Sequence, residues 1–447
     1  MKKDYNIKST HYLGSKLRML QAIKEAIDKA DITDGVMCDL FSGSGVVSEY
    51  MLQYRDVISV DIQNYSQVYS LARLSGFDSK YDIDDIVNQI KISSCRKYNT
   101  EIFNVLTAYE SSCISHAKEG KVDQLYEIIE KGSLYAYLND MQYSDGDLSQ
   151  SLEAVFSNIK QRLSVDGKTD SLDTIVTRYY GGLYFSFSQA LDIDAIASYA
   201  YSQEKVLKNK ILAALLGATT DVVNTVGKQF AQPLKVRKKD GTLKLSLLRK
   251  IISDREMDVF NQFAKWLSYY LAIPKPSHQF DVICNDYAEV LRSLTGKNIS
   301  VIYADPPYTR YHYSRYYHIL ETICLHDNPT ISTTFPNGKG GISRAIYRDD
   351  RHQSPFCIKS KAAKAFEQLF LLSKEAGAAL VLSYSPYDNT SGATPRMMSI
   401  DDLACMAKRY YDDVSVVSPG QFMHSRFNSS DNNYEINYEA ERLLICK

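Results

Sequence analysis

The chain of 447 residues contains 45% apolar and 23% charged residues, values that are close to those of folded, soluble domains. This composition excludes disordered and fibrous proteins, and it predicts about two or three domains or one elaborated domain. The 52 lysines and arginines nearly balance the 53 aspartates and glutamates. That balance excludes a protein that coats nucleic acid with a uniformly basic surface, but it is compatible with a local basic groove.

Eight cysteines are scattered along the chain without a C-x-x-C pair. This pattern indicates neither a disulfide framework nor a thiolate metal site, so we expect reduced thiols and no bound metal. The N-terminus lacks the apolar stretch of a signal peptide, and no apolar run approaches about 18 residues. We therefore expect a soluble, cytoplasmic protein that does not contact a membrane.

A strand, a glycine turn and a helix open the recognisable part of the chain. The apolar run Val36 to Leu40 precedes Phe41-Ser-Gly-Ser-Gly45, and helix-like spacing follows from Val46 to Tyr54. A second apolar run, Val57 to Val60, ends at Asp61 and precedes another helical pattern. This order predicts an α/β doubly wound domain.

A large insertion interrupts this pattern. Between about 81 and 173 the segments are long and charged with helical spacing, and no convincing strand occurs. Further on, Asp240-Gly241 between alternating residues predicts a hairpin within the strongly basic segment Lys235 to Lys250. Such a hairpin favours contacts with phosphates, and an exposed structural hairpin is the alternative. Its candidate DNA-binding residues are Arg237, Lys238, Lys239 and Lys244.

Strand patterns resume after the insertion. The predicted strands are Phe280 to Cys284, Ile299 to Ala304, Ala378 to Ser383, Val414 to Val417 and Arg442 to Cys446. Because these strands belong with the two near the N-terminus, we expect one sheet that a large, mostly helical insertion splits in the sequence.

The glycine turn after Asp39 is the first candidate site. Gly43 and Gly45 let the backbone approach a ligand closely, and an open α/β sheet places nucleotides at such strand-to-helix turns. Ser48 replaces the third glycine of the dinucleotide fingerprint, and Asp61 comes earlier than the acid of that fingerprint. An acid at this place can bind ribose hydroxyls. The pattern favours a nucleotide-like cofactor over a purely structural turn.

Asp305-Pro-Pro-Tyr308 directly follows the strand that ends at Ala304. Two prolines alone are more often a rigid junction, because they fix the backbone. An acid, a fixed carbonyl and an aromatic ring together fit the methylation of a base amino group. Asp305 and the Pro306 carbonyl can each accept one N–H hydrogen, which frees the nitrogen lone pair, and Tyr308 can stack on an extruded base.

These motifs together resemble a class alpha DNA adenine-N6 methyltransferase, in which the cofactor motif comes first, target recognition follows and DPPY comes late. Tyr12-Leu-Gly-Ser-Lys16 is similar to the family's N-terminal cofactor motif, and Asp39 to Gly45 resembles its S-adenosyl-L-methionine (AdoMet) loop. The segments Tyr313 to Thr322, Ser354 to Lys359 and Leu382 to Tyr384 are also similar.

The resemblance implies a Rossmann-like AdoMet methyltransferase sheet with an antiparallel last strand. It implies a catalytic domain at 1–80 and 275–447, a helical insertion at 81–175 and a target-recognition region at 176–274. The implied cofactor-binding residues are Tyr12, Lys16, Asp39, Phe41, Gly43, Gly45, Asp61, Asp286 and Tyr287. The implied catalytic residues are Asp305, Pro306, Pro307 and Tyr308.

Within that set the resemblance assigns particular contacts. Asp39 would meet the methionine amino group of AdoMet, and Asp61 would meet the ribose hydroxyls. Asp286 and Tyr287 would meet the adenine ring of the cofactor, and a polar strand end is the alternative for this pair.

Basic residues just past the DPPY motif form a further candidate group. Arg310 and Arg315 are placed to clamp phosphates beside a flipped nucleotide, and solvated loop charges are the alternative. Other basic residues lie farther on, namely Arg344, Arg348, Arg351 and His352.

The sequence thus predicts site-specific N6 methylation of adenine in double-stranded DNA, in a bacterial, archaeal or phage-infected cell. The partner would be a cognate restriction endonuclease, or the enzyme would be an orphan methylase. An RNA adenine methyltransferase and a DNA cytosine amino-group methyltransferase remain alternatives, although the latter typically has serine in place of Asp305. A non-catalytic DNA-binding regulator and a nicotinamide-dependent oxidoreductase are alternatives of other classes. Tyr308 argues against the regulator and Ser48 against the oxidoreductase.

Overall fold

The computed structural model describes residues 7–8, 10, 16–77, 81–141, 147–308, 313–333, 342–385, 396–418 and 441–447. The backbone divides into two compact units, and the first comprises Met1–Asp78, Ala272–Ser314 and His352–Lys447. The second comprises Ser79–Leu271 and Arg315–Arg351. The second unit is therefore built from two insertions. The predicted catalytic range 275–447 differs from the first unit because Arg315–Arg351 packs with the helices.

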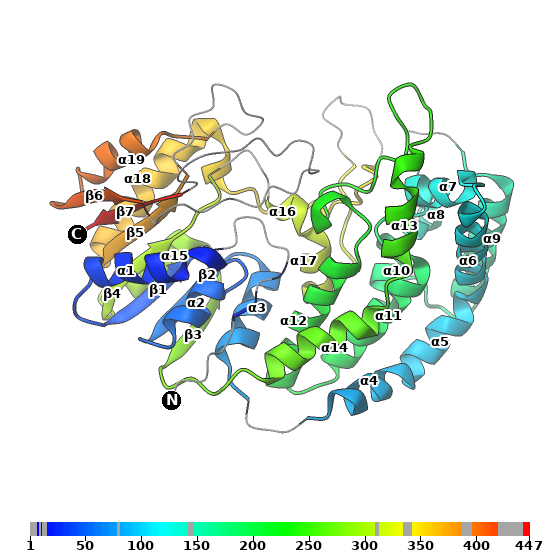
Figure 1. Cartoon of the computed structure of the whole chain (residues 1–447), viewed down its shortest axis with the longest axis horizontal. Helices are drawn as coiled ribbons and strands as arrows, with labels where there is room; N and C mark the ends of the chain where they lie inside the picture. The colour runs from blue at the N-terminus through cyan, green and yellow to red at the C-terminus, as the bar shows by residue number, and fades with distance from the viewer. Residues whose placement is uncertain are drawn as a thin grey trace. The chain divides into compact units, whose positions relative to one another are not determined.

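The first unit contains a seven-stranded sheet with the order β3-β2-β1-β4-β5-β7-β6 (Figure 1). The strands are β1 (Val36–Leu40), β2 (Val57–Asp61), β3 (Phe280–Cys284), β4 (Ile299–Ala304), β5 (Ala379–Tyr384), β6 (Val414–Val417) and β7 (Arg442–Cys446). Strands β1 to β5 pair in parallel, whereas β7 pairs antiparallel with both β5 and β6. The predicted α/β sheet with an antiparallel last strand is confirmed.

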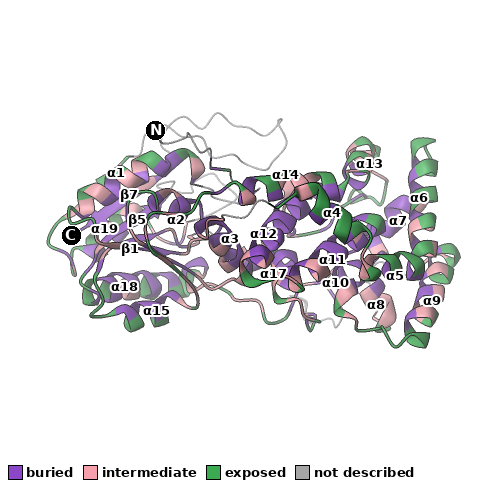
Figure 2. Cartoon of the chain, turned by 90° about the horizontal axis from the view of Figure 1, so that it is seen from below, coloured by how far each residue is buried: buried purple, intermediate pink, exposed green. Residues whose placement is uncertain are grey.

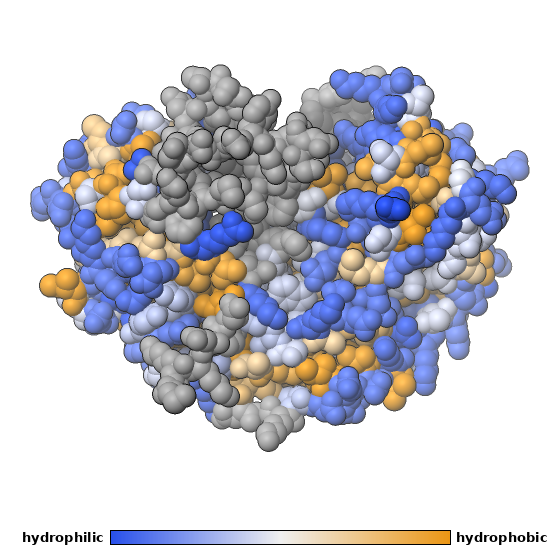
Figure 3. Space-filling model, in the orientation of Figure 1, coloured by the Kyte–Doolittle hydropathy of each residue, from blue (hydrophilic) through white to orange (hydrophobic). Residues whose placement is uncertain are grey.

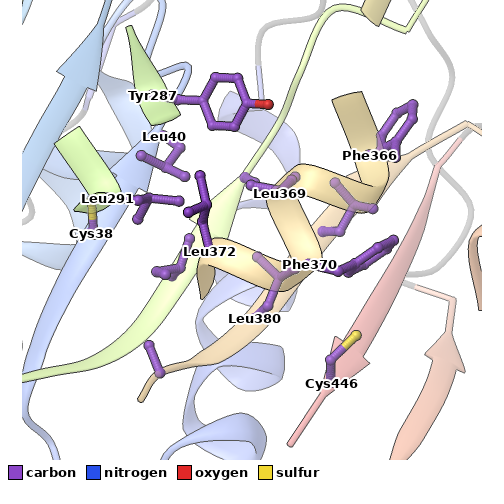
Figure 4. Packing of buried hydrophobic residues seen from close by; sticks show 14 of the residues in the cluster. Cys38, Leu40, Tyr287, Leu291, Phe366, Leu369, Phe370, Leu372, Leu380 and Cys446 are labelled. Atoms are coloured by element: carbon purple, nitrogen blue, oxygen red, sulfur yellow. The ribbon is translucent and has the colours of Figure 1, made fainter. Parts of the chain in front are cut away.

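Helices cover both faces of this sheet. One face packs against α1 (Leu20–Ala30), α2 (Val46–Met51) and α3 (Asn64–Leu74), and the other against α15 (Tyr287–Leu294), α18 (Lys359–Glu375) and α19 (Ile400–Ala407). Alternation along β1 sends Cys38 and Leu40 into the second core, whereas Met37 enters the first. Figure 4 shows Phe366, Leu369 and other residues of the second core. Two short 3-10 helices, Leu17–Met19 and Pro355–Cys357, also belong to this unit.

The second unit is helical over its described residues. Its helices are α4 (Ile83–Lys91), α5 (Ser94–Ile102), α6 (Asn104–Lys118), α7 (Asp123–Lys131), α8 (Leu134–Leu138), α9 (Gln150–Val165), α10 (Ile175–Tyr179), α11 (Phe187–Tyr201), α12 (Lys205–Val222), α13 (Leu248–Arg255), α14 (Val259–Leu271) and α17 (His318–Leu325). The short helix α16 (Tyr313–Tyr316) lies where the chain passes from the first unit to the second. Helix α12 is buried along most of its length (Figure 2). The predicted helical insertion is confirmed.

The described part of the chain has no helix that is long and apolar enough to cross a membrane.

The close packing of α12 against α14 in the second unit depends on Gly217. A Cβ atom at this position of α12 would lie 2.6 Å from the indole ring of Trp266 in α14. The indole N–H of Trp266 donates a hydrogen bond to Asp221 over 2.7 Å, so the ring cannot move away freely. Gly217 thus allows the two helices to approach each other.

We predict that Gly217→Ala lowers the free energy of unfolding by about 1–3 kcal/mol, because the added methyl group overpacks this contact. Urea unfolding followed by tryptophan fluorescence measures the loss, since Trp266 is the single tryptophan of the chain. Ser157→Ala, on the exposed side of α9, is the matched control and should leave the midpoint unchanged. An unchanged midpoint for Gly217→Ala would contradict the prediction.

Candidate active site

The candidate site lies at the carboxyl edge of the sheet, where the strand order reverses between β1 and β4. Leu40 pairs with Ala304 at the ends of these two parallel strands. The N–H of Asp305 donates to the Leu40 carbonyl over 3.4 Å. The two sequence motifs, which begin at Phe41 and Asp305, therefore leave the sheet side by side. Ligands of open α/β sheets bind at such a switch point.

The turn after β1 has a special backbone conformation. Phe41, Gly43 and Gly45 have φ angles of 61°, 54° and 72°. Glycine adopts this left-handed region freely, whereas a side chain such as that of Phe41 does so at a cost in strain. The N–H of Ser42 donates to the Val60 carbonyl over 3.0 Å and ties the turn to β2. The sequence predicted the two glycines but not the strained Phe41.

Arg73 of α3 anchors the same turn. Its guanidinium donates to the Ser44 carbonyl over 2.6 Å and forms a buried ion pair with Glu49 at 2.6 Å. The Ser66 hydroxyl donates to the Gly43 carbonyl. These bonds fix the carbonyls of the turn, and the N–H of Gly45, which donates to the Ser42 carbonyl over 2.8 Å, closes it.

Asp61, at the end of β2, is oriented by backbone donors. The N–H of Gly43 donates to one carboxylate oxygen and the N–H of Gln63 to the other, both over 2.9 Å. Burial raises the pKa of Asp61, and the hydrogen bonds from Gln63 and Gly43 oppose this effect without cancelling it. Asp61 is thus a fixed carboxyl group on the wall of a pocket.

A pocket of about 960 Å³, with its open mouth included, lies at this edge of the first unit. It brings together the predicted residues Lys16, Phe41, Asp61, Asp286, Tyr287, Asp305, Pro306, Pro307 and Tyr308. It also contains residues to which the sequence analysis assigned no pocket role, among them Tyr65, His352, Phe356 and Cys357. Among the described residues, no group of three or more His, Cys, Asp or Glu side chains could hold a metal ion.

Three aromatic rings form one wall of the pocket. The Phe41 ring lies 5.2 Å from that of Tyr287 and 5.3 Å from that of Phe356. The Tyr287 hydroxyl donates to the Ala365 carbonyl over 3.2 Å, which holds its ring in place. Asp286 caps α15 by accepting the N–H of Ala288. The wall is aromatic and apolar with a carboxylate beside it, which suits a purine ring.

Lys16 lies between two carboxylates. Its ammonium nitrogen is 2.7 Å from Asp305 Oδ2 and 3.4 Å from Glu441 Oε1. Burial by itself lowers the pKa of Lys16, but the charges of Asp305 and Glu441 outweigh it, so the pKa is raised. The sequence predicted Lys16 as a cofactor contact, and the structure shows that it also forms an ion pair with the DPPY aspartate.

Tyr308 is fixed at both ends of its side chain. Its hydroxyl donates to Glu441 over 3.0 Å, and its ring packs against Tyr384 at 4.8 Å with the Arg396 guanidinium 5.2 Å from the ring centre. Burial raises the pKa of Tyr308, and the Glu441 charge adds to the effect. The Cys357 thiol donates to the Pro307 carbonyl over 3.3 Å, so the backbone of the motif is also held.

Asp39 does not line the pocket. It is 1% exposed, and the Ser48 hydroxyl donates to its carboxylate. Burial raises its pKa to about 7, and the charges of Asp305 and Asp61 add to the effect, whereas the Ser48 hydrogen bond opposes it. Its side chain follows the alternation of β1, in which the neighbours Cys38 and Leu40 face the opposite core. The contact of Asp39 with the methionine amino group stays a prediction.

The remaining predicted cofactor and phosphate contacts divide into two groups. Tyr12 and Arg310 lie outside the described residues. Arg315 is exposed, and its guanidinium lies 5.7 Å from the ring centre of Tyr347, with that of Arg351 4.7 Å from the same ring.

Two of the basic residues farther along the chain, Arg344 and Arg348, bind partners inside the helical unit. Arg344 donates to the Leu234 carbonyl over 3.2 Å, and the buried Arg348 forms ion pairs with Asp327 at 2.6 Å and Asp350 at 2.8 Å. The idea that they clamp phosphates is thus not supported for these two, because both guanidiniums bind acceptors within the second unit.

The basic hairpin forms at the predicted place. The N–H of Lys238 donates to the Thr242 carbonyl over 2.8 Å, and Gly241 has a φ of 83°. Lys238 and Lys239 are exposed, whereas Arg237 forms an ion pair with Glu130 at 3.0 Å. The ammonium of Lys244 donates to the Lys235 carbonyl over 2.9 Å. Hydrophilic side chains cover this tip in the upper right of Figure 3.

Comparisons with known proteins found one matching family model and several relatives. Residues 12–150 match the family model of the D12 class N6 adenine-specific DNA methyltransferase. The chain is 25% identical over 421 residues to the modification methylase LlaI of Lactococcus lactis subsp. lactis, covering 94% of this chain and 52% of the relative. It is 22% identical over 437 residues to the modification methylase StsI of Streptococcus sanguinis, covering 97% and 51%. The chain therefore spans about half the length of these two relatives.

A third relative is covered more fully. Over 363 residues the chain is 24% identical to the type II methyltransferase M.NlaIII of Neisseria lactamica, with 80% of this chain and 79% of the relative aligned.

The mostly parallel sheet, its antiparallel β7 and the pocket at the switch point define an α/β domain of the Rossmann-like type. Residues 12–150 match the D12 class of N6 adenine-specific DNA methyltransferases, and the chain is similar to the three relatives named above. The family resemblance inferred from the sequence motifs is thus confirmed.

The raised pKa of Asp39 has a consequence for stability. Its folded-state pKa of about 7 lies above the ordinary value of 3.8, so the folded protein binds more protons than the unfolded chain between these values. The contribution of Asp39 to stability therefore falls as the pH rises from about 4 to 7.

We predict that Asp39→Asn has a small effect on the free energy of unfolding at pH 5 and becomes stabilising relative to the parent at pH 8. Denaturant titrations at both values measure the difference. Asp31→Asn is the control, because hydrogen bonds from Ser300, Thr33 and Arg55 outweigh the burial of Asp31 and lower its pKa to about 2. It should destabilise equally at both pH values. An equal effect of Asp39→Asn at both would contradict the prediction.

Proposed function

We propose that this chain transfers a methyl group from AdoMet to N6 of adenine in double-stranded DNA. The observation that carries the proposal is the single pocket in which Asp305, Pro306 and Tyr308 lie together with Asp61 and the aromatic wall. The description of the matching family supports adenine in DNA as the substrate. The names of the relatives support a restriction-modification role, with a cognate endonuclease as partner.

The donor set of the pocket fits AdoMet. Asp61 offers a carboxylate for the ribose hydroxyls, and Asp286 lies beside the aromatic wall that would take the adenine ring. AdoMet supplies an electrophilic methyl group when it is bound. We include Lys16 and the predicted Tyr12 among the residues that line the cofactor.

The DPPY motif would prepare the amino group of the base. The Asp305 carboxylate and the Pro306 carbonyl each accept one N–H hydrogen, which draws the nitrogen toward tetrahedral geometry and frees its lone pair. The prolines fix the direction of that carbonyl. Tyr308, held by Glu441 and Tyr384, stacks on the extruded base. Alignment for in-line attack is then the main contribution of these residues to the rate.

The helical unit would read the DNA. We assign 81–175 to a helical extension of the recognition surface and 176–274 to target recognition. The exposed Lys238 and Lys239 of the hairpin supply phosphate contacts. The two guanidiniums of Arg315 and Arg351 at the ring of Tyr347 offer a further site for a phosphate.

We predict that the protein produces N6-methyladenine and that Asp305→Ala abolishes it. The test is nucleoside digestion and mass spectrometry of DNA from cells that lack their own adenine methylases. N4-methylcytosine as the product would establish the cytosine alternative. Methylated adenine in RNA but not in DNA would establish the RNA alternative, and no modified nucleoside from soluble protein that binds AdoMet would contradict the proposal.

Contacts between the hairpin and DNA phosphates are tested by how the affinity for DNA changes with salt concentration, not by the affinity at one salt concentration. We predict that the double variant Lys238→Ala/Lys239→Ala reduces the slope of log K against log salt by about 1 for each lost phosphate contact. Fluorescence anisotropy with duplex DNA at several salt concentrations gives the slope. Lys408→Ala, an exposed lysine of the first unit, is the control and should leave the slope unchanged. Equal slopes for the hairpin variant and the control would remove the hairpin from the interface.

A further inference from the structure

Glu441 lies at the centre of a buried network that no sequence motif indicates. The Tyr308 and Ser383 hydroxyls each donate to its Oε1 over 3.0 Å. The Lys16 ammonium lies 3.4 Å from the same oxygen and 2.7 Å from Asp305 Oδ2. One carboxylate oxygen thus connects the first and the last residue of the DPPY motif.

The network joins parts of the chain that are far apart in sequence. Glu441 immediately precedes β7, Ser383 belongs to β5, and Lys16 precedes the first helix of the chain. The antiparallel pairing of β5 with β7, in which Tyr384 lies opposite Arg442, brings Glu441 to the carboxyl edge of β5. The antiparallel strand therefore places a carboxylate beside the Tyr308 hydroxyl and the Lys16 ammonium.

Burying these charges is costly unless they compensate one another. Glu441 is 1% exposed and Lys16 is 5% exposed. A buried ion pair is often no more stabilising than a well-packed apolar pair, so stability alone is a weak reason for its presence. A network with fixed hydrogen bonds instead holds its members in one arrangement.

We propose that Glu441 is a positioning residue for the DPPY motif. It fixes Tyr308 directly through the phenolic hydroxyl and fixes Asp305 through the ammonium of Lys16. This inference rests on the proposed methyl transfer, in which Asp305 and Tyr308 hold the base. Tyr308 would otherwise rotate about its side-chain bonds, and a small misplacement of the base lowers the rate of an alignment-dependent reaction steeply.

The test combines Glu441→Gln with Tyr308→Phe, which keeps the ring and removes only the hydroxyl. For Glu441→Gln we expect the single-turnover methylation rate to fall by about 10- to 100-fold. The calorimetric Kd for AdoMet should stay within about threefold of the parent, because Glu441 is not among the residues of the pocket wall. Adding Tyr308→Phe to Glu441→Gln should cost less than Tyr308→Phe costs in the parent, since the glutamine has already weakened the hydrogen bond that Tyr308→Phe removes.

A matched control separates positioning from a general loss of stability. Asp31→Asn also removes a buried, paired carboxylate, whose partner is Arg55 at 2.8 Å, but it lies before β1 and away from the pocket. It should lower the melting temperature and leave the methylation rate of the folded enzyme unchanged. A parent-like rate for Glu441→Gln, or rate losses that multiply in the double variant, would overturn the proposal.

A second readout does not depend on activity. Thermal unfolding of the parent, the two single variants and the double variant forms a cycle, and we expect the two changes to be strongly non-additive. Additive losses would show that Glu441 and Tyr308 are not coupled, whether or not the protein methylates DNA. If Glu441→Gln does not fold, Tyr308→Phe alone decides, because a parent-like rate for it would show that the bond to Glu441 has no role.

Discussion

The parallel pairing of β1 with β4 is the interaction on which the whole site depends. These strands are neighbours in the sheet although most of the helical unit lies between them in the sequence. The strained turn at Phe41 begins at the carboxyl end of β1, and the rigid Asp305-Pro-Pro-Tyr308 segment begins at the carboxyl end of β4. Strand β2 adds Asp61 at the same edge. A ligand pocket at the switch point follows directly from this order of strands.

Buried charge is the second constraint on the molecule. The first unit buries the carboxylates of Asp39 and Glu441. Asp39 accepts a hydrogen bond from the Ser48 hydroxyl, and Glu441 accepts one from the Tyr308 hydroxyl. Such groups are kept when they fix a functional arrangement, because an apolar core would often be as stable. Rigidity at this edge suits a reaction in which alignment contributes more than proton transfer.

Much of the sheet could be predicted from local pattern. The seven strands begin and end within about one residue of the predicted ranges, because apolar runs bounded by turns are a local signal. The glycine turn and the DPPY motif were found for the same reason, since their chemistry is carried by neighbours in sequence. The hairpin at Asp240 was also predicted, because its turn residues determine it.

The residues that were missed depend on tertiary contacts. Glu441 lacks any local signature, and only the pairing of β5 with β7 brings it to Tyr308. Phe356 and Cys357 lie in the family-like segment Ser354 to Lys359, but only the packing of this segment before α18 gives them a place in the pocket. Arg348 is the opposite case, a residue that the sequence suggested for the site but that the structure places elsewhere. Its position after a catalytic motif is typical of a phosphate ligand, but in the fold it pairs with Asp327 and Asp350. Sequence gives the type of each charge, whereas its partner is determined by the fold.

The most direct test of this account is a calorimetric titration of the protein with AdoMet, comparing the parent with Asp61→Ala. The account predicts that the parent binds one AdoMet and that Asp61→Ala loses most of the affinity, because the carboxylate at the end of β2 holds the ribose. Asp281→Ala, which removes an exposed carboxylate of β3, should bind as the parent does. No binding by the folded parent, or equal binding by Asp61→Ala, would contradict the assignment of the pocket.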